Sequence, residues 1–160
     1  MAELKTDVAV LGAGPAGYVC AIRLAQYGRK VVVIEQDTLG GTCLNVGCIP
    51  SKALIVAGHF MEQARGAAEM GITVGEPKLD VQKLVGWKAG IVKKLTGGVD
   101  LLFKKRGIQW LKGKGTVVSP NAIDVKTAEG VTRVTARDLV LASGSEPVTF
   151  PGFEFGEHVW

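Results

Sequence analysis

Residues 7–17 read DVAVLGAGPAG and decide the fold of this 160-residue chain. The apolar run at residues 7–11 is typical of a strand buried on both faces, as in a parallel sheet. After the glycine-rich turn, apolar residues recur at helical spacing to about Tyr27. Residues 31–35 then predict a second buried strand that ends in Glu35. This βαβ order predicts an α/β fold with a parallel sheet and flanking helices.

The turn itself has the GxGxxG spacing of a dinucleotide site. In such a turn Gly12 permits the tight bend, Gly14 lets the backbone approach a pyrophosphate, and Gly17 lets helix and strand pack closely. Glu35 follows Gly17 by 18 residues, where an acid accepts hydrogen bonds from a ribose. An acid here favours NAD or FAD over NADP, and these residues alone do not separate NAD from FAD.

A second motif, GGTCLNVGCIPSK at residues 40–52, places Cys43 and Cys48 five positions apart in a loop before a predicted helix. A nearby helix start stabilises a thiolate, so a redox-active pair is favoured. A purely structural disulfide is less favoured, because no secretory signal precedes it. A zinc site needs about four ligands, and no metal site is expected. The remaining candidate ligands, at unhelpful spacings, are Cys20, His59 and His158.

The composition is that of a soluble globular domain, with 47% apolar residues, 21% charged residues and 22 glycines. No apolar run approaches the length of a membrane span, and residues 1–7 lack a targeting pattern. We therefore expect a cytoplasmic protein without a membrane partner. The net charge is +4, with basic clusters at residues 93–94 and 104–106. Aromatic residues are not interleaved with them, so a solvated helix face is favoured over a nucleic-acid site.

The remaining pattern predicts helices, then strands. The helices are expected at 53–70 and 81–103, the second interrupted at Gly97–Gly98 and ended by Gly107. A short strand is expected at 108–111, followed by an antiparallel meander. The meander strands are 115–118, 122–126 and 131–135, and a further buried strand is expected at 138–142. Residues 147–160 have the composition of a linker, so we expect one domain over residues 1–146.

Taken together, the two motifs resemble the flavin disulfide reductases, and the resemblance covers essentially the whole chain. Within that family the chain is most similar to the dihydrolipoamide dehydrogenase subfamily. Leu44 and Ile49 stand where glutathione and mercuric reductases typically carry valine, and Ser51-Lys52 also fits the subfamily. The resemblance implies the N-terminal third of such an enzyme. That part is an incomplete Rossmann-like FAD-binding domain, with 147–160 leading toward an NAD-binding domain that this sequence lacks.

The resemblance also implies roles for individual residues. Cys43 matches the interchange thiol, Cys48 the flavin-proximal thiol in charge-transfer contact, and Lys52 the lysine beside flavin N5. Gly115, with Gly113 as the alternative, matches a glycine that contacts adenine. The implied cofactor contacts are Gly12, Gly14, Pro15, Ala16, Gly17, Glu35, Gln36, Gly40, Gly41, Thr42, Cys43, Cys48, Lys52, Gly115, Ala142, Ser143 and Gly144.

The activity implied is oxidation of dihydrolipoamide to lipoamide through the cysteine pair and FAD, with NAD⁺ as acceptor. The implied partners are the lipoyl groups of an acyltransferase in a 2-oxoacid dehydrogenase complex, of the pyruvate or 2-oxoglutarate kind. A homodimer is implied for the full-length enzyme, and the 160-residue piece is not expected to turn over alone. Two alternatives stay open: a glutathione- or mercuric-reductase-type enzyme, and a non-catalytic nucleotide-binding or complex-docking module.

Overall fold

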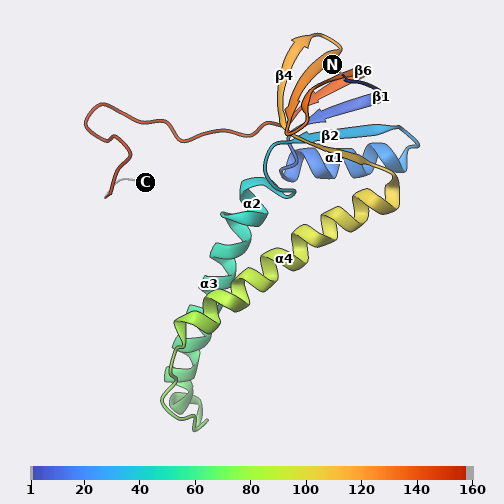
Figure 1. The fold of residues 1–160 in the computed structure, drawn as a ribbon. Helices are drawn as coiled ribbons and strands as arrows, with labels where there is room; N and C mark the ends of the chain where they lie inside the picture. Colours follow the sequence, from blue (N-terminus) through green and yellow to red (C-terminus); the bar gives the residue numbers. More distant parts are fainter. Residues whose placement is uncertain (1, 158–160) are drawn as a thin grey trace.

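A computed structural model describes residues 2–157 and shows one six-stranded sheet with helices beside it (Figure 1). The strand order across the sheet is β3-β2-β1-β6-β5-β4. The strands are β1 (Ala2–Leu11), β2 (Val31–Glu35), β3 (Gln109–Lys112), β4 (Lys114–Ser119), β5 (Ala122–Thr127) and β6 (Gly130–Leu141). The helices are α1 (Pro15–Gln26), α2 (Gly41–Asn45), α3 (Cys48–Gly66) and α4 (Val81–Arg106), with a 3₁₀ turn η1 (Ala67–Met70) after α3.

The parallel part of the sheet confirms the predicted βαβ unit. Strand β1 lies between β2 and β6 and is parallel to both, and β3 extends the sheet beyond β2. Four consecutive residues of β2, Val31–Ile34, are buried, because both faces of the strand are covered. On one face, Val8 and Val10 pack with Ala21 of α1 and Phe103 of α4. The uninterrupted apolar run in the sequence therefore has its physical cause in two covered faces.

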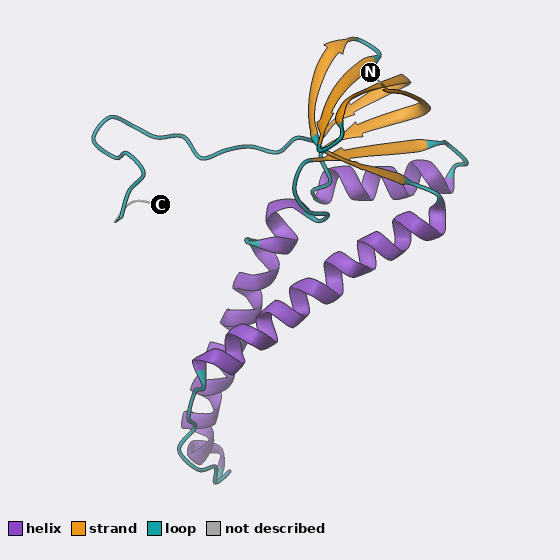
Figure 2. Cartoon of the chain, in the orientation of Figure 1, coloured by secondary structure: helices purple, strands orange, loops and turns teal. Residues whose placement is uncertain are grey.

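The other face of the parallel strands is covered by the antiparallel part of the same sheet. Ala9, Val32 and Ile34 form a second buried cluster with Ile123 and Val125 of β5. The sheet curls so that β4 and β5 lie over β2 and β3. Figure 2 shows the strands spreading out from one narrow end. The sheet is thus folded onto itself, and no second layer of helices is needed to bury this face.

Strand β6 connects the two parts of the sheet, and the expectation of two separate strands at 131–135 and 138–142 is wrong. Its first half is antiparallel to β5, while residues 132–141 are parallel to β1. Arg137 and Asp138, near the expected gap, are exposed and lie within the continuous strand. The meander and the parallel sheet are therefore one structure.

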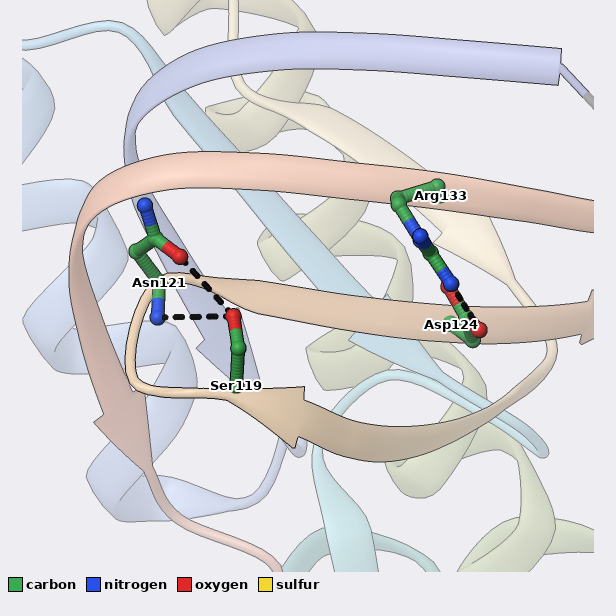
Figure 3. Close-up of polar contacts among 4 residues, drawn as sticks. All are labelled: Ser119, Asn121, Asp124 and Arg133. Carbon is green, nitrogen blue, oxygen red and sulfur yellow. Dashed lines mark hydrogen bonds and ion pairs between the residues drawn. The ribbon is translucent and has the colours of Figure 1, made fainter.

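A cross-strand ion pair joins β5 and β6 in the antiparallel part of the sheet (Figure 3). Arg133 of β6 lies directly opposite Asp124 of β5. Its guanidinium donates two hydrogen bonds to the carboxylate, at 2.6 Å from Nε and 2.7 Å from Nη2. The pair holds the pKa of Asp124 below its usual range. In the turn before β5, the backbone N–H of Asn121 donates a hydrogen bond to the Ser119 hydroxyl oxygen at 3.4 Å.

Helices α3 and α4 form a long hairpin that projects from the sheet (Figure 1). Only the sheet end of α4 enters the core, through Val99 and Phe103. The expected interruption at Gly97–Gly98 is wrong, because α4 runs unbroken from Val81 to Arg106. Nor does close packing explain these two glycines, since a Cβ on either would meet no described atom within 4 Å. Gly107, in the left-handed conformation, ends the helix as predicted.

The hairpin carries large apolar side chains that the described residues do not cover. They include Val56, Phe60, Val85, Trp87 and Leu101. By length and composition the helical segment Gly41–Met70 could span a membrane, contrary to the expectation that no apolar run comes near that length. Helices that pack against another part of a protein pass the same test. Only 17% of its most apolar window is buried here, so most of that window is not covered by the rest of the described chain.

Residues 142–157 follow β6 without a helix or strand, apart from a single bridge between Phe150 and Phe153. Val148, Phe150 and Phe155 are all exposed. The linker expected at 147–160 falls largely in this segment, while His158 lies outside the described residues.

Candidate functional site

Two adjoining hollows lie where the parallel strands end. The first has a volume of about 590 Å³ and extends from the turn after β1 to the two cysteines. The second, of about 410 Å³, extends toward Gly113 and Gly115 at the start of β4. Both are lined by Gly12, Glu35, Gln36 and residues 143–145, so they form one continuous cleft. The carboxyl ends of parallel strands are the usual ligand position in open α/β sheets.

Most of the predicted site residues line this cleft. The first hollow brings together Gly12, Gly14, Pro15, Ala16, Glu35, Gln36, Gly41, Thr42, Cys43, Cys48, Ala142, Ser143 and Gly144. Gly115 lines the second hollow, as does its alternative Gly113. The structure thus gathers residues from both sequence motifs and from the end of β6 around a single space.

The turn after β1 has no room for a side chain at two of its glycines. Gly12 has a φ of +100°, and a Cβ there would lie 2.2 Å from the carbonyl oxygen of Ala142. A Cβ on Gly17 would lie 1.9 Å from the carbonyl oxygen of Gly12. Both contacts are far inside van der Waals distance, so Gly12 permits the tight turn as predicted, and Gly17 lets α1 pack closely against the turn itself. Gly17 is buried behind the turn and does not line the cleft.

The carboxylate of Glu35 is held in place by backbone groups on both sides. Its Oε2 accepts a hydrogen bond from the Ala13 N–H at 2.9 Å, and its Oε1 accepts one from the Asp37 N–H at 2.9 Å. A carboxylate oxygen has a second lone pair, so each oxygen keeps capacity for a ligand hydroxyl. The acid is therefore fixed at the cleft wall with acceptors available, as ribose binding requires.

The two cysteines lie on successive short elements at one end of the cleft. Cys43 is in α2, and Cys48 is the first residue of α3. The expected helix start at residue 53 is therefore wrong by about one turn. The apolar periodicity begins only after Pro50, but proline is tolerated in a first helical turn because the N–H groups there have no helical partner. Both cysteines are free thiols in this structure.

The two thiols interact directly. The hydrogen bond between the Cys43 and Cys48 side chains, together with desolvation, raises the pKa of the Cys43 thiol above its ordinary value. The Cys48 N–H and the positive charge of Lys52 act in the opposite direction but are weaker. A helix start alone would lower a thiol pKa. For Cys43 the neighbouring thiol outweighs that effect, so the reduced pair favours the protonated form of Cys43.

Two predicted site residues besides Gly17 do not line the cleft. Gly40 is buried beneath the loop, where a Cβ would lie 2.7 Å from the Leu44 side chain. Lys52 is exposed one turn after Cys48 on α3. Its charge still reaches the cysteine pair, because it acts to lower the pKa of Cys43.

Sequence reasoning missed several residues of the first hollow. They are Asp37, Thr38, Asn45, Val46, Gly47 and Ser145. All lie in turns or at helix ends, where no periodicity marks the facing side. Asn45 had an available signal, because it is the one amide side chain between the two cysteines.

The cleft fits a dinucleotide in shape and in chemistry. Its two hollows are continuous, and one end meets the N-terminus of α1, which no side chain among the described residues caps. The first N–H groups of a helix lack helical partners and favour a phosphate. Glu35 supplies acceptors for a ribose beside them. Within residues 2–157, no three His, Cys, Asp or Glu side chains gather as a metal site.

Comparison with known families gives one match over almost the whole chain. Residues 6–159 match the family model described as pyridine nucleotide-disulphide oxidoreductase. This match includes the glycine turn, the cysteine pair and the end of β6.

Curated relatives agree with this match. The chain is 47% identical over 156 residues to the dihydrolipoyl dehydrogenase of Bacillus subtilis and 46% identical to that of Geobacillus stearothermophilus. Each alignment covers 98% of this chain and 33% of the relative. The Vibrio cholerae dihydrolipoyl dehydrogenase is 47% identical over 150 residues, covering 93% of this chain and 32% of that protein. The chain thus spans about a third of the length of the relatives it matches.

A solved structure has the same fold. It is the Cu(II) complex of the HOCl-induced flavoprotein disulfide reductase RclA from Escherichia coli, with a TM-score of 0.73 and 25% identity. The match covers 92% of this chain and 30% of that protein.

Proposed function

Because this chain belongs to the pyridine nucleotide-disulphide oxidoreductase family, we propose that it provides the FAD-binding and disulfide-bearing part of a dihydrolipoyl dehydrogenase. The solved structure with the same fold is a flavoprotein disulfide reductase, and the relatives at 46–47% identity are dihydrolipoyl dehydrogenases. The observation that carries the proposal is the position of Cys43 and Cys48, which both line the first hollow of the dinucleotide-sized cleft.

The proposed reaction begins with the pair as a disulfide. One thiolate of dihydrolipoamide attacks the Cys43 sulfur, breaks the Cys43–Cys48 bond and forms a mixed disulfide. The second thiolate of the substrate then attacks the substrate sulfur that is bonded to Cys43. This breaks the mixed disulfide and releases Cys43. Lipoamide leaves oxidised, the two cysteines are reduced, and the two substrate protons pass to the thiols or to solvent. Cys43 holds its proton readily afterwards, because the Cys48 side chain raises its pKa.

The proposed cofactor is FAD, and the cleft residues fit it. Glu35 would accept hydrogen bonds from the adenosine ribose, and the N-terminus of α1 would face the pyrophosphate. Residues 40–43 and 142–144 would line the remainder, with Lys52 bringing a positive charge beside the cysteine pair. When bound, the flavin supplies a two-electron acceptor for the reduced pair.

NAD⁺ is the proposed final acceptor, bound by residues outside this sequence, which has a single GxGxxG turn. The proposed partners are lipoyl groups carried by the acyltransferase of a 2-oxoacid dehydrogenase complex, and the proposed full-length enzyme is a homodimer. These proposals rest on the named relatives, which are three times as long as this chain.

The test measures FAD binding and disulfide reduction on the purified chain. Titration with FAD should quench flavin fluorescence, and Glu35→Ala should weaken this binding by about tenfold or more, since it removes a charged hydrogen-bond acceptor. The oxidised chain should be reduced faster by dihydrolipoamide than by dithiothreitol, an equally bidentate dithiol. The Cys43→Ser variant cannot form the Cys43–Cys48 disulfide. Neither dithiol should therefore release a pair of protein thiols from it. Equal rates with the two dithiols, or no FAD binding, would contradict the proposal.

A further inference from the structure

The backbone just before Cys43 has an unusual conformation. Gly40 and Gly41 are consecutive residues with positive φ, at +100° and +57°. The left-handed region is costly for residues with a Cβ, and two such residues in sequence form a sharp reversal. Cys43 follows two positions later, so the orientation of this reversal sets where α2 begins and where the Cys43 side chain lies.

One side of this reversal is held by the turn after β1. The Gly40 N–H donates to the carbonyl oxygen of Ala13 at 2.8 Å. A Cβ on Gly41 would lie 2.6 Å from the Cα of Gly14, so the two backbones touch. The Ala13 N–H in turn donates to Glu35. The loop that carries the cysteines is therefore fixed to the nucleotide turn through backbone contacts.

The other side is held by the Leu44 N–H, which donates to the carbonyl oxygen of Gly40 at 3.3 Å, and by one polar side chain, that of Asn45. Its Nδ2 donates one hydrogen bond to the carbonyl oxygen of Leu39 at 3.1 Å and another to that of Gly41 at 2.9 Å. An amide nitrogen has two N–H donors, so both are used. These carbonyls stand on either side of Gly40 and enclose the reversal. Asn45 is half-buried, and water competes only partly for these bonds.

We propose that Asn45 is a positioning residue that sets the dithiol–disulfide equilibrium of Cys43 and Cys48. The proposal rests on the proposed function, because it requires that this pair cycles between the two states. With the reversal held, Cys43 and Cys48 line the same end of the first hollow, near enough for Cys48 to raise the pKa of Cys43. Without the two bonds α2 gains freedom, the thiols meet less often, and ring closure becomes less favourable.

The equilibrium is measured with glutathione. The protein dithiol and glutathione disulfide give the protein disulfide and two glutathione thiols, so two electrons and two hydrogens pass from the cysteines to glutathione. Purified chains that all carry Cys20→Ser are equilibrated at a series of glutathione ratios and quenched with acid. Maleimide labelling and intact mass then give the fraction of disulfide, and tryptic peptides confirm that it joins Cys43 to Cys48.

Two variants test the amide, and a remote asparagine serves as the control. Asn45→Ala removes both donors. Asn45→Asp keeps the shape, but at pH 7 its carboxylate only accepts and faces two carbonyl oxygens. Asn121→Ala removes the same side chain from the turn before β5, at a position that lines neither hollow. Circular dichroism and thermal unfolding establish which variants fold, and Asn45→Asp carries the test if Asn45→Ala does not.

Both Asn45 variants should reduce the equilibrium constant for disulfide formation by about tenfold, the effect of losing one to two ordinary hydrogen bonds. Asn121→Ala should match the parent chain. A folded Asn45→Asp chain within about twofold of the parent would overturn this inference alone. A parent chain that forms no Cys43–Cys48 disulfide at any ratio would overturn the proposed function, and this inference with it.

Discussion

At the scale of single residues, the chemistry of the site is set by which groups each cysteine touches. Cys43 is half-buried and interacts with the Cys48 side chain, while Lys52 acts on it only through charge. Hydrogen bonding between two thiols favours the protonated donor. The reduced pair is consequently a weaker nucleophile at Cys43 than a thiol at an isolated helix start would be.

We predict that Cys48→Ala lowers the pKa of Cys43, because it removes the largest cause of the upward shift. The thiolate is the form that reacts with iodoacetamide, so the pH at which alkylation of Cys43 is half-maximal should fall. The measurement is the rate of alkylation across pH 6–10, with Cys43 followed by peptide mass spectrometry. Both chains carry Cys20→Ser, and the chain with Cys43 and Cys48 intact and reduced is the reference. A midpoint that stays in place or rises would show that Cys48 is not the cause.

Much of the site could be predicted from the sequence, because its spacing carries the information. The glycine turn, Glu35 and the cysteine pair lie at fixed separations along the chain, and all line one cleft. Asn45 and Val46 could not be placed, since a five-residue helix shows no periodic face. The direction of the Cys43 pKa also depends on a contact between side chains, which spacing alone does not give.

At the scale of elements, α4 is anchored by a few residues near its C-terminal end. Phe103 is 2% exposed and packs with Val8 and Val10 of β1, whereas Phe60 on the neighbouring helix α3 is 70% exposed. The two phenylalanines therefore separate the core end of the hairpin from its projecting part.

Phe103→Ala should lower the free energy of unfolding by about 3–5 kcal/mol, through lost apolar burial and the cavity left behind. Phe60→Ala, the same change on an exposed surface, should alter it by less than about 0.5 kcal/mol. Urea denaturation followed by circular dichroism gives both values. Similar losses in the two variants would mean that the hairpin is packed quite differently from the arrangement described.

The helices and strands could be predicted where the apolar pattern is long. The prediction was poorer for β6, which belongs to both the parallel and the antiparallel part of the sheet. The βαβ unit and the meander are both present. The single strand β6 was missed because its pairing with β1 depends on residues more than 120 positions away. Gly97–Gly98 suggested a break in α4, yet the helix continues, since glycine weakens a helix without forbidding it.

At the scale of the whole molecule, the exposed apolar surface of α3 and α4 is the main feature that the described residues leave uncovered. Val56 and Phe60 lie one turn apart on α3 and are both exposed. Surfaces of this kind are usually contact surfaces in a complete protein. The relatives are about three times as long as this chain.

We predict that the purified chain self-associates, because water contact with this surface is unfavourable. Sedimentation velocity at increasing concentration should show species larger than the 16.8 kDa monomer. The double variant Val56→Glu, Phe60→Glu should shift the distribution toward the monomer, while Val148→Glu, an equally exposed site on the tail, should have little effect. A concentration-independent monomer for the unmodified chain would refute the prediction.

The pairing of β1 with β6 also has a consequence for the order in which the chain is made. Strand β1 is complete at Leu11, but its neighbour in the sheet ends only at Leu141. At ribosomal rates of roughly 5–20 residues per second, that gap corresponds to a delay on the order of ten seconds. During that time the nascent chain has an open β1 edge and an unfinished nucleotide turn, because Gly12 packs against Ala142. The cofactor cleft can therefore form only after synthesis has passed the end of β6.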